Sequence, residues 1–293
     1  MTMIASVGPE LPLDLLQATG RYAGPLGWNV DRDMPLAAQW LESKFPRWSF
    51  SILEDWAIGA LDSYEAVVFS RANDAAQRLY YYVCELQRRG AIGGPRPLIC
   101  DVARIARGSS LDHAVSAIGK LADQLGVDDA ALEQAIVAGN RHRVQAHAPE
   151  GRLCLLGGTA PPDRRIHAMI EAAGWVPAGP TLADQWSDAG PVVVENTGDP
   201  HAALGQAMHA RHGGGRGFFA RGEAIVEAVQ TNGAEAVVLW FAEEDETEIW
   251  HLPEQRQALE AAGIPLLSLT RRDWRANDGV DAQIAGFLGG LGA

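Results

Sequence analysis

The chain has 293 residues, enough for two domains of ordinary size, and its 47% hydrophobic and 21% charged residues are typical of a globular protein. A net charge of −13, with a pI of about 5.0, argues against nucleic acid or an anionic membrane surface as a general partner, because both are negatively charged. No apolar run approaches the roughly 18 residues of a membrane span.

The first sixty residues are expected to be mainly helical. Residues 1–30 predict a helix punctuated by prolines, with Pro12 in its first turn and Gly20 at its end. Residues 35–61 predict helices that pack across a sheet. They carry three tryptophans spaced eight residues apart, which are Trp40, Trp48 and Trp56. A tryptophan-lined ligand wall is the alternative, but burial in the core is the commoner use of such residues.

A strand, a tight turn and a helix at residues 66–82 organise the rest of the chain. Residues 66–69 form a short apolar, β-branched run typical of a buried strand, and small polar residues from Ser70 to Asp74 follow it. Ligands of open α/β sheets bind at the carboxyl ends of strands, which makes this turn a candidate site. From the spacing alone, the favoured interpretation is an ordinary turn with Asn73 or Asp74 as the helix N-cap.

The remainder of the first half predicts one strand and two helices. The strand covers residues 97–100, one helix ends at Gly126, and the next runs from Asp128 to about residue 147. Residues 146–151 contain a proline and a glycine and predict a domain boundary. We therefore expect an amino-terminal α/β domain over residues 1–149 and a carboxyl-terminal one over residues 150–293.

The second half repeats this alternation. Its predicted strands cover residues 153–156, 191–195, 236–241 and 265–269. Helices are predicted to end near residues 174, 209, 232 and 263, with an amphipathic helix at the carboxyl terminus. Alternating elements in both halves predict an α/β protein with two Rossmann- or flavodoxin-like domains and mostly parallel sheets. Ligands of such proteins commonly sit between the domains.

Several residue groups could carry chemistry, and each has an ordinary alternative. The glycine-rich loop at residues 213–217 follows a predicted helix, so it does not match a nucleotide-binding fingerprint, although Arg216 could hold an anion. His209 and His212 could share a metal but lack a third ligand, and solvated histidines at a helix end are favoured. Residues 243–246 are four consecutive carboxylates, for which a solvated acidic loop is favoured over a cation site.

The cysteines also bear on compartment and chemistry. They are odd in number and widely spaced, and each lies in an apolar stretch: Cys84, Cys100 and Cys154. Such cysteines are typically buried thiols in a reducing compartment, and none lies beside a histidine that could activate it. No signal peptide is apparent at the amino-terminal end. These features together predict a cytoplasmic protein.

The order of several short stretches resembles the 2-hydroxyacyl-CoA dehydratase family, which includes subunits of the ATP-dependent benzoyl-CoA reductases. Residues 8–20 (GPELPLDLLQATG) resemble its amino-terminal P-x-E-L-I-x-A-A-G stretch, and residues 67–80 (VVFSRANDAAQRLY) resemble its strand that ends in Cys-Asp before Arg-Leu-Tyr. Further similar stretches occur in the same order at residues 135–141, 156–158, 170–174, 236–241 and 261–267. The resemblance covers nearly the whole chain.

The departures from that family concern its iron–sulfur site. Family members are expected to hold a [4Fe–4S] cluster between their domains through three cysteines, yet the first 83 residues here contain none. Asn73 stands where the cysteine of Cys-Asp is expected, and Ala242, or a close neighbour, replaces the third. Amide and methyl groups cannot replace thiolates as cluster ligands. The resemblance therefore implies that this chain holds no cluster or metal, and that a homologous partner subunit carries the cluster.

Three functions follow as alternatives. The chain is predicted first to be a cluster-free subunit that supports an acyl-CoA site on that partner. The second alternative is a non-redox enzyme on the same fold, using Asp74, Arg71, His209 or the carboxylates of residues 243–248, and the third is a ligand-binding or scaffolding protein. No catalytic residue is assigned. The candidates for lining the cleft are Ser70, Arg71, Asn73, Asp74, Gly157, Gly158, Phe241, Ala242 and Glu243.

Overall fold

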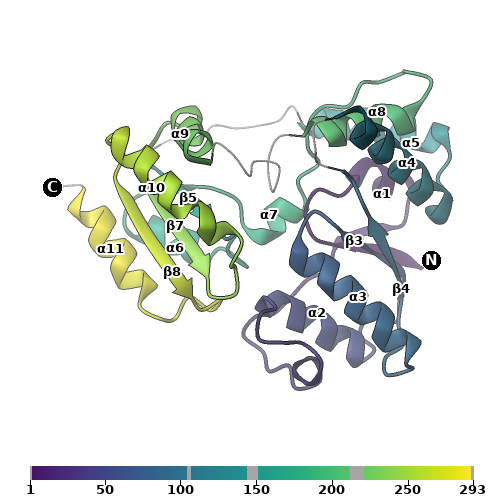
Figure 1. The fold of residues 1–293 in the computed structure, drawn as a ribbon, viewed down its shortest axis with the longest axis horizontal. Helices are drawn as coiled ribbons and strands as arrows, with labels where there is room; N and C mark the ends of the chain where they lie inside the picture. The colour runs from purple at the N-terminus through teal and green to yellow at the C-terminus, as the bar shows by residue number, and fades with distance from the viewer. Residues whose placement is uncertain (1, 104–106, 144–150, 212–220, 292–293) are drawn as a thin grey trace.

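In the computed structural model, which describes residues 2–103, 107–143, 151–211 and 221–291, the chain forms two four-stranded parallel sheets (Figure 1). The first sheet has the order β2-β1-β3-β4 and the second has the order β6-β5-β7-β8. The strands are β1 (Met3–Val7), β2 (Tyr22–Pro25), β3 (Tyr64–Ser70), β4 (Arg96–Cys100), β5 (Leu153–Gly158), β6 (Val176–Ala178), β7 (Ala234–Ala242) and β8 (Leu266–Arg272). The predicted α/β class with two Rossmann- or flavodoxin-like parallel sheets is confirmed.

The two sheets repeat one plan. In each sheet the first strand along the chain lies between the second and the third, and the fourth lies outside the third. The third strand therefore occupies the same place in both, which makes β3 and β7 equivalent. Both are long apolar runs buried on two faces, as central parallel strands usually are.

Helices cover both faces of each sheet, as Figure 1 shows for α3 beside β3 and α11 beside β8. Their bounds are α1 (Leu13–Ala18), α2 (Arg47–Ala57), α3 (Asp74–Arg88), α4 (Gly108–Leu125), α5 (Asp129–Arg143), α6 (Arg165–Ala172), α7 (Leu182–Trp186), α8 (Pro200–Ala210), α9 (Arg221–Asn232), α10 (Leu252–Ala261) and α11 (Val280–Gly290). Short 3₁₀ helices, η1 (Ala37–Gln39) and η3 (Glu248–His251), complete the described elements. None of the helices in the described residues is long and apolar enough to cross a bilayer.

Alternation along β3 divides the core of the first sheet. Ala66 and Val68 face helices α1, α4, α5 and α8, whereas Val67 and Phe69 face α2 and α3. This follows from the two-residue period of a strand. The cluster that contains Val67 continues into the second half of the chain through α6, α7 and α11, so one hydrophobic core joins the two sheets.

The core interpretation of the tryptophans is confirmed for two of them. Trp48 and Trp56 are 2% and 1% exposed, and Trp40 is partly buried against the same cluster. Each tryptophan therefore contributes apolar area to the core rather than to an open ligand wall.

The single helix expected over residues 1–30 is wrong. Strands β1 and β2 flank the short helix α1, and parallel pairing with each other and with β3 holds them in the sheet. Each strand has only four or five residues, too few to show a clear period in sequence. The edge strand β6 was missed for the same reason, since it has three residues, one of them a proline.

The strand expected over residues 191–195 is also wrong. No strand among the described residues pairs with this segment; the side chain of Asn140, on α5, binds the main chain of Val193 instead. Helix α8 then packs against α4 and α5, on the first sheet, although it lies in the second half of the sequence. The predicted boundary falls mainly on residues outside the described ranges, so the domain limits stay a prediction.

Candidate functional site

The turn after β3 brings four predicted residues together. Asn73 caps helix α3, because its Oδ1 accepts a hydrogen bond from the backbone N of Ala76 at 2.9 Å. The Oγ of Ser70 accepts one from the backbone N of Ala72 at 3.0 Å. Asp74 is exposed and lies 3.6 Å from Arg78 in the next helical turn. The capping interpretation of Asn73 is therefore confirmed.

A polar group at the end of the neighbouring strand completes this edge of the first sheet. Asp101 directly follows β4, and its Oδ2 forms an ion pair with Arg71 and lies 3.2 Å from the Nε2 of His113. Arg71 and His113 are each about half exposed. Sequence reasoning missed Asp101 and His113. The available signal was the position of Asp101, one residue beyond a predicted strand.

The turn after β5 is tightly built. Gly158 has a φ of +86°, and a Cβ there would collide with the carbonyl oxygen of Trp240, so only glycine fits. Thr159, which follows, donates through its Oγ1 to Asp245 at 2.7 Å and accepts there from the backbone N of Ala242 at 3.1 Å. Thr159 thus ties the end of β5 to the end of β7.

The candidates at the end of β7 differ in exposure. Phe241 and Ala242 are 1% and 3% exposed, and each belongs to a hydrophobic core. Glu243 is exposed and lies 3.3 Å from Arg271. Gly157 and Gly158 lie beside this strand in register with Leu239 and Trp240. These five candidates therefore meet at one edge of the second sheet.

Two carboxylates beyond β7 have altered acidity. Burial raises the pKa of Glu244, whose Oε2 accepts a hydrogen bond from the indole Nε1 of Trp274 at 2.6 Å. Burial also raises the pKa of Glu248, against the opposing effect of Arg221 at 3.7 Å. Within the described ranges, no three histidine, cysteine, aspartate or glutamate side chains are grouped closely enough to hold a metal ion.

The cysteines are spread over three elements. Cys84 lies on α3, Cys100 ends β4 and Cys154 lies in β5. All three are free thiols, and burial raises the pKa of Cys100 and of Cys154 to about 12. These thiols lie on separate elements and, among the described residues, belong to no group that could hold a metal ion.

Asn73 and Ala242 do not supply the missing ligands. The Asn73 amide oxygen already caps a helix, and the Ala242 side chain is a buried methyl group. The residues at these two positions therefore do not fit a [4Fe–4S] cluster.

The carboxyl ends of strands from both sheets meet through tryptophans. Trp28, just beyond β2, donates from its Nε1 to the carbonyl oxygen of Pro162, beyond β5, at 3.1 Å. Trp186, at the end of α7, makes edge-to-face contacts with Trp28 and Trp48 at centroid distances of 4.7 and 4.9 Å. Figure 1 shows α7 between the two sheets. An ion pair from Arg165 to Asp31 at 2.9 Å adds a polar link between the two halves.

The candidates at the turn after β3 and those at the ends of β5 and β7 do not contact each other directly through polar groups among the described residues. Across the described residues, no hydrogen bond or ion pair joins the turn after β3 to the ends of β5 and β7. That all nine residues line one cleft is therefore still a prediction. His209 ends α8, on the other side of the first sheet's core, whereas His212 and residues 213–217 lie outside the described ranges.

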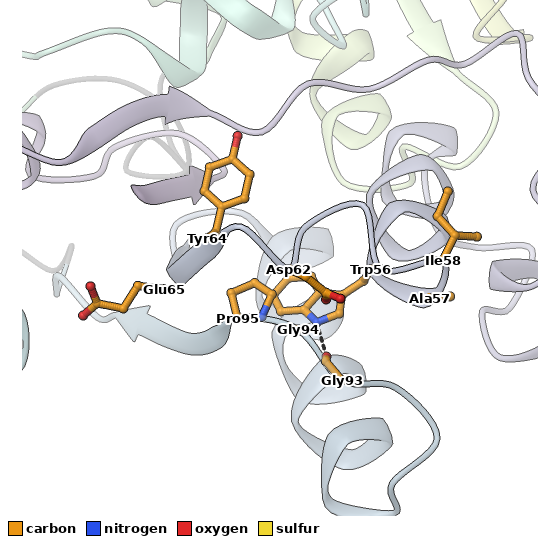
Figure 2. A pocket seen from close by; sticks show the side chains of 10 residues that line it. Trp56, Ala57, Ile58, Asp62, Tyr64, Glu65, Gly93, Gly94 and Pro95 are labelled. Carbon is orange, nitrogen blue, oxygen red and sulfur yellow. Dashed lines mark hydrogen bonds between the residues drawn. The ribbon is translucent and has the colours of Figure 1, made fainter. Parts of the chain in front are cut away.

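A hollow lies at the opposite end of the first sheet. It has a volume of about 550 Å³ and is lined by the end of α2 with the turn after it, the start of β3 and the loop before β4. Figure 2 shows Tyr64 and Glu65 pointing away from Trp56, and Glu65 is already engaged by Arg21. Because its polar side chains diverge, this hollow lacks the convergent polar groups typical of a ligand site.

Comparisons with known proteins add no identification. No protein-family model matches the chain, and no curated protein matches it.

Proposed function

We propose that this chain is a cytoplasmic, cluster-free subunit of a 2-hydroxyacyl-CoA dehydratase-like or benzoyl-CoA reductase-like complex. In this role it supports an acyl-CoA site on a homologous, cluster-bearing partner. The chain itself supplies no electron to the reaction. Its contribution is the surface formed at the carboxyl ends of its two sheets.

One observation carries the proposal. The strands β3 and β7 are equivalent, because the two sheets have the same strand order. Asn73 lies just beyond β3, and Ala242 is the last residue of β7. These are the positions at which the resembling family is expected to have cluster cysteines. A duplicated fold with both ligand positions replaced fits a subunit that keeps the family's shape without its redox chemistry. Fold alone does not decide function, so the proposal needs a direct test.

Polar groups at the first of these edges suit an acyl-CoA. Coenzyme A carries phosphates, and Arg71 and His113 are half-exposed basic side chains beside the turn after β3. Their shared partner Asp101 holds both near that turn. A phosphate that approached would compete with Asp101 for Arg71, because guanidinium groups bind phosphate oxygens well.

Coenzyme A thioesters are expected to raise the melting temperature. A ligand that binds only the native state at about a hundredfold over its Kd stabilises that state by roughly 2.7 kcal/mol, which a thermal scan detects. The Arg71→Ala variant should show a smaller shift, and Arg88→Ala, an exposed change at the far end of α3, should match the wild type. No shift with any thioester, with or without a cluster-bearing homologue, would contradict a direct acyl-CoA role.

Anaerobic incubation with iron, sulfide and a thiol reductant is expected to leave the protein colourless. The reason is that no thiol lies at either ligand position, and the three existing thiols lie on separate elements, with Cys100 and Cys154 buried. The outcome is measured by the absorbance of the charge-transfer bands of an iron–sulfur cluster and by iron analysis after desalting. A stable brown species with stoichiometric iron in the wild-type chain would overturn the proposal.

A non-redox enzyme on the same fold is the second candidate, and one residue favours it. Glu244 is a carboxyl group with a raised pKa at the carboxyl end of a central strand, where catalytic acids are often found. Turnover of an acyl-CoA or small acid by the purified chain alone, lost in Glu244→Gln, would support this candidate. Co-purification with a cluster-bearing chain from the native host would support the first.

A further inference from the structure

Three arginines from separate segments meet where the two halves of the chain join. Arg165, at the start of α6, binds both carboxylate oxygens of Asp31, at 3.2 and 2.9 Å, and donates to the carbonyl oxygen of Arg275 at 2.8 Å. Arg47, at the start of α2, donates to the carbonyl oxygen of Val30, next to Asp31. Val30 and Asp31 come after β2, and Arg275 comes after β8, so this group lies beyond the carboxyl ends of strands from both sheets.

Two of these guanidinium groups have no carboxylate partner. Within the described ranges, the side chain of Arg275 forms no hydrogen bond or ion pair, and Arg47 binds only main-chain carbonyl oxygens, through its Nε and one Nη. Both side chains are partly buried. Arg165 differs, because all three of its nitrogens already bind Asp31, Asp163 or the main chain. Free donors therefore remain on Arg47 and Arg275.

The two unpaired guanidinium groups act on each other electrostatically. Burial lowers the pKa of Arg47, and the positive charge of Arg275 lowers it further. The carboxylates of Asp31, Asp33 and Asp273 oppose that shift, yet among the described residues none of them forms an ion pair with either arginine. Two like charges that are partly buried repel each other, so an anion that contacts both is favoured there.

The loop that carries Arg275 is tightly built. Its neighbours Trp274 and Ala276 are 3% and 4% exposed, and the backbone N of Ala276 donates to the carbonyl oxygen of Asp273 at 2.9 Å. Ala276 has a φ of +50°, a conformation that is uncommon for a residue with a Cβ. Together with the hydrogen bond from Arg165, this turn fixes the main chain from which the Arg275 side chain extends.

We propose that Arg47 and Arg275 together bind a phosphate group, either as inorganic phosphate or as part of a phosphorylated ligand such as a coenzyme A ester. Guanidinium groups bind phosphate and carboxylate oxygens in pairs. A carboxylate has two oxygens, which one guanidinium can occupy, as Arg165 does with Asp31. A phosphate has more free oxygens, so it can bridge two guanidinium groups that come from opposite halves of the chain. This binding does not require the proposed acyl-CoA role.

Calorimetric titration with inorganic phosphate, beside thermal scans in phosphate and chloride at equal ionic strength, tests the proposal. Arg275→Gln removes a guanidinium with no side-chain partner among the described residues, so the variant should fold and bind phosphate at least about tenfold more weakly. Arg271→Gln is the matched control, because it removes an 81% exposed arginine from the same part of the chain and should bind as the wild type does.

The deciding comparison is between these proteins, because phosphate also stabilises folded proteins in general. Phosphate is expected to raise the melting temperature of the wild type and of Arg271→Gln more than that of Arg275→Gln. A wild type that shows no binding of phosphate, or Arg275→Gln that binds it as tightly as the wild type, would overturn the proposal.

Titration with adenosine 3′,5′-bisphosphate, the phosphorylated nucleoside of coenzyme A, distinguishes the two sources of the group. Tighter binding than that of inorganic phosphate, lost in Arg275→Gln, would support a coenzyme A ester as the ligand. Equal or weaker binding, with the phosphate effect still lost in Arg275→Gln, would support inorganic phosphate. Because inorganic phosphate is the first probe, the proposal can hold when no thioester binds, and it can fail when a thioester does.

Discussion

Replacing Arg143 with alanine is expected to lower the free energy of unfolding by about 3–5 kcal/mol, the cost of leaving a buried charge without its partner. Arg143, at the end of α5, binds Asp14 on α1 through two nitrogens, at 2.6 and 3.2 Å. Both side chains are buried, at 5% and 4% exposure. The same guanidinium donates to the carbonyl oxygens of Ala189 and Gly190. It therefore also holds the chain directly before residues 191–195.

The loss should depend on pH in a defined direction. Burial raises the pKa of Asp14, and the hydrogen bond and charge of Arg143 partly offset that rise. Removing the guanidinium should therefore raise the pKa of Asp14 further. A carboxyl whose pKa is higher in the folded state binds more protons there, and stability falls as pH rises through that window. Arg143→Ala should therefore cost more at pH 7 than near the ordinary aspartate value of 3.8.

Urea unfolding of Arg143→Ala at both pH values, beside the wild type, measures these effects. Arg141→Ala is the matched control, since it removes an exposed arginine from the same helical turn and should change stability by less than about 0.5 kcal/mol. Equal stability of both variants would show that the buried ion pair does not hold α1 to α5.

Replacing Trp186 with alanine is expected to destabilise the protein by about 3–5 kcal/mol, the usual cost of deleting a fully buried large aromatic side chain. Trp186 is 1% exposed and contacts Trp28 and Trp48 from the first half of the chain. The change therefore opens a cavity where the two sheets share a core. Because the coupling between the halves weakens, we expect a broader thermal transition than in the wild type.

Two further variants make this result specific to the shared core. The indole Nε1 of Trp186 is buried without a hydrogen-bond partner, so Trp186→Phe loses no hydrogen bond and should cost much less than the alanine. Trp250, on η3, is 81% exposed, so Trp250→Ala should leave stability within about 0.5 kcal/mol. Calorimetry of all three compares them directly, and equal melting temperatures for Trp186→Ala and Trp250→Ala would contradict the shared core.

The central elements could be predicted because their signals are local. The apolar runs within β3 and β7 are long enough to show buried strands, and the polar turn at Ser70–Asp74 gave the start of α3 with Asn73 as its cap. Gly126 ends α4 in the left-handed conformation, where glycine lacks the steric cost of a Cβ. The α/β class and the parallel sheets follow from such local patterns.

The edge strands and the candidate site depended on contacts between distant residues. β1 and β2 are strands because β3 pairs with them, and Asp101 approaches Arg71 because β4 lies beside β3.

By itself, then, the sequence determined the types of the central elements around β3 and β7 and the absence of thiols at Asn73 and Ala242, since these depend on residue identity and short spacing. Only the tertiary structure decided that residues 191–195 bind a side chain rather than a strand. The sequence around Val193 predicts a strand because three valines follow one another. The hydrogen-bond partner of the Val193 backbone is instead the side chain of Asn140, 53 residues earlier. The tertiary structure likewise decided that α8 returns to the first sheet and that Trp186 closes a core shared by both, because packing selects partners that sequence spacing does not specify.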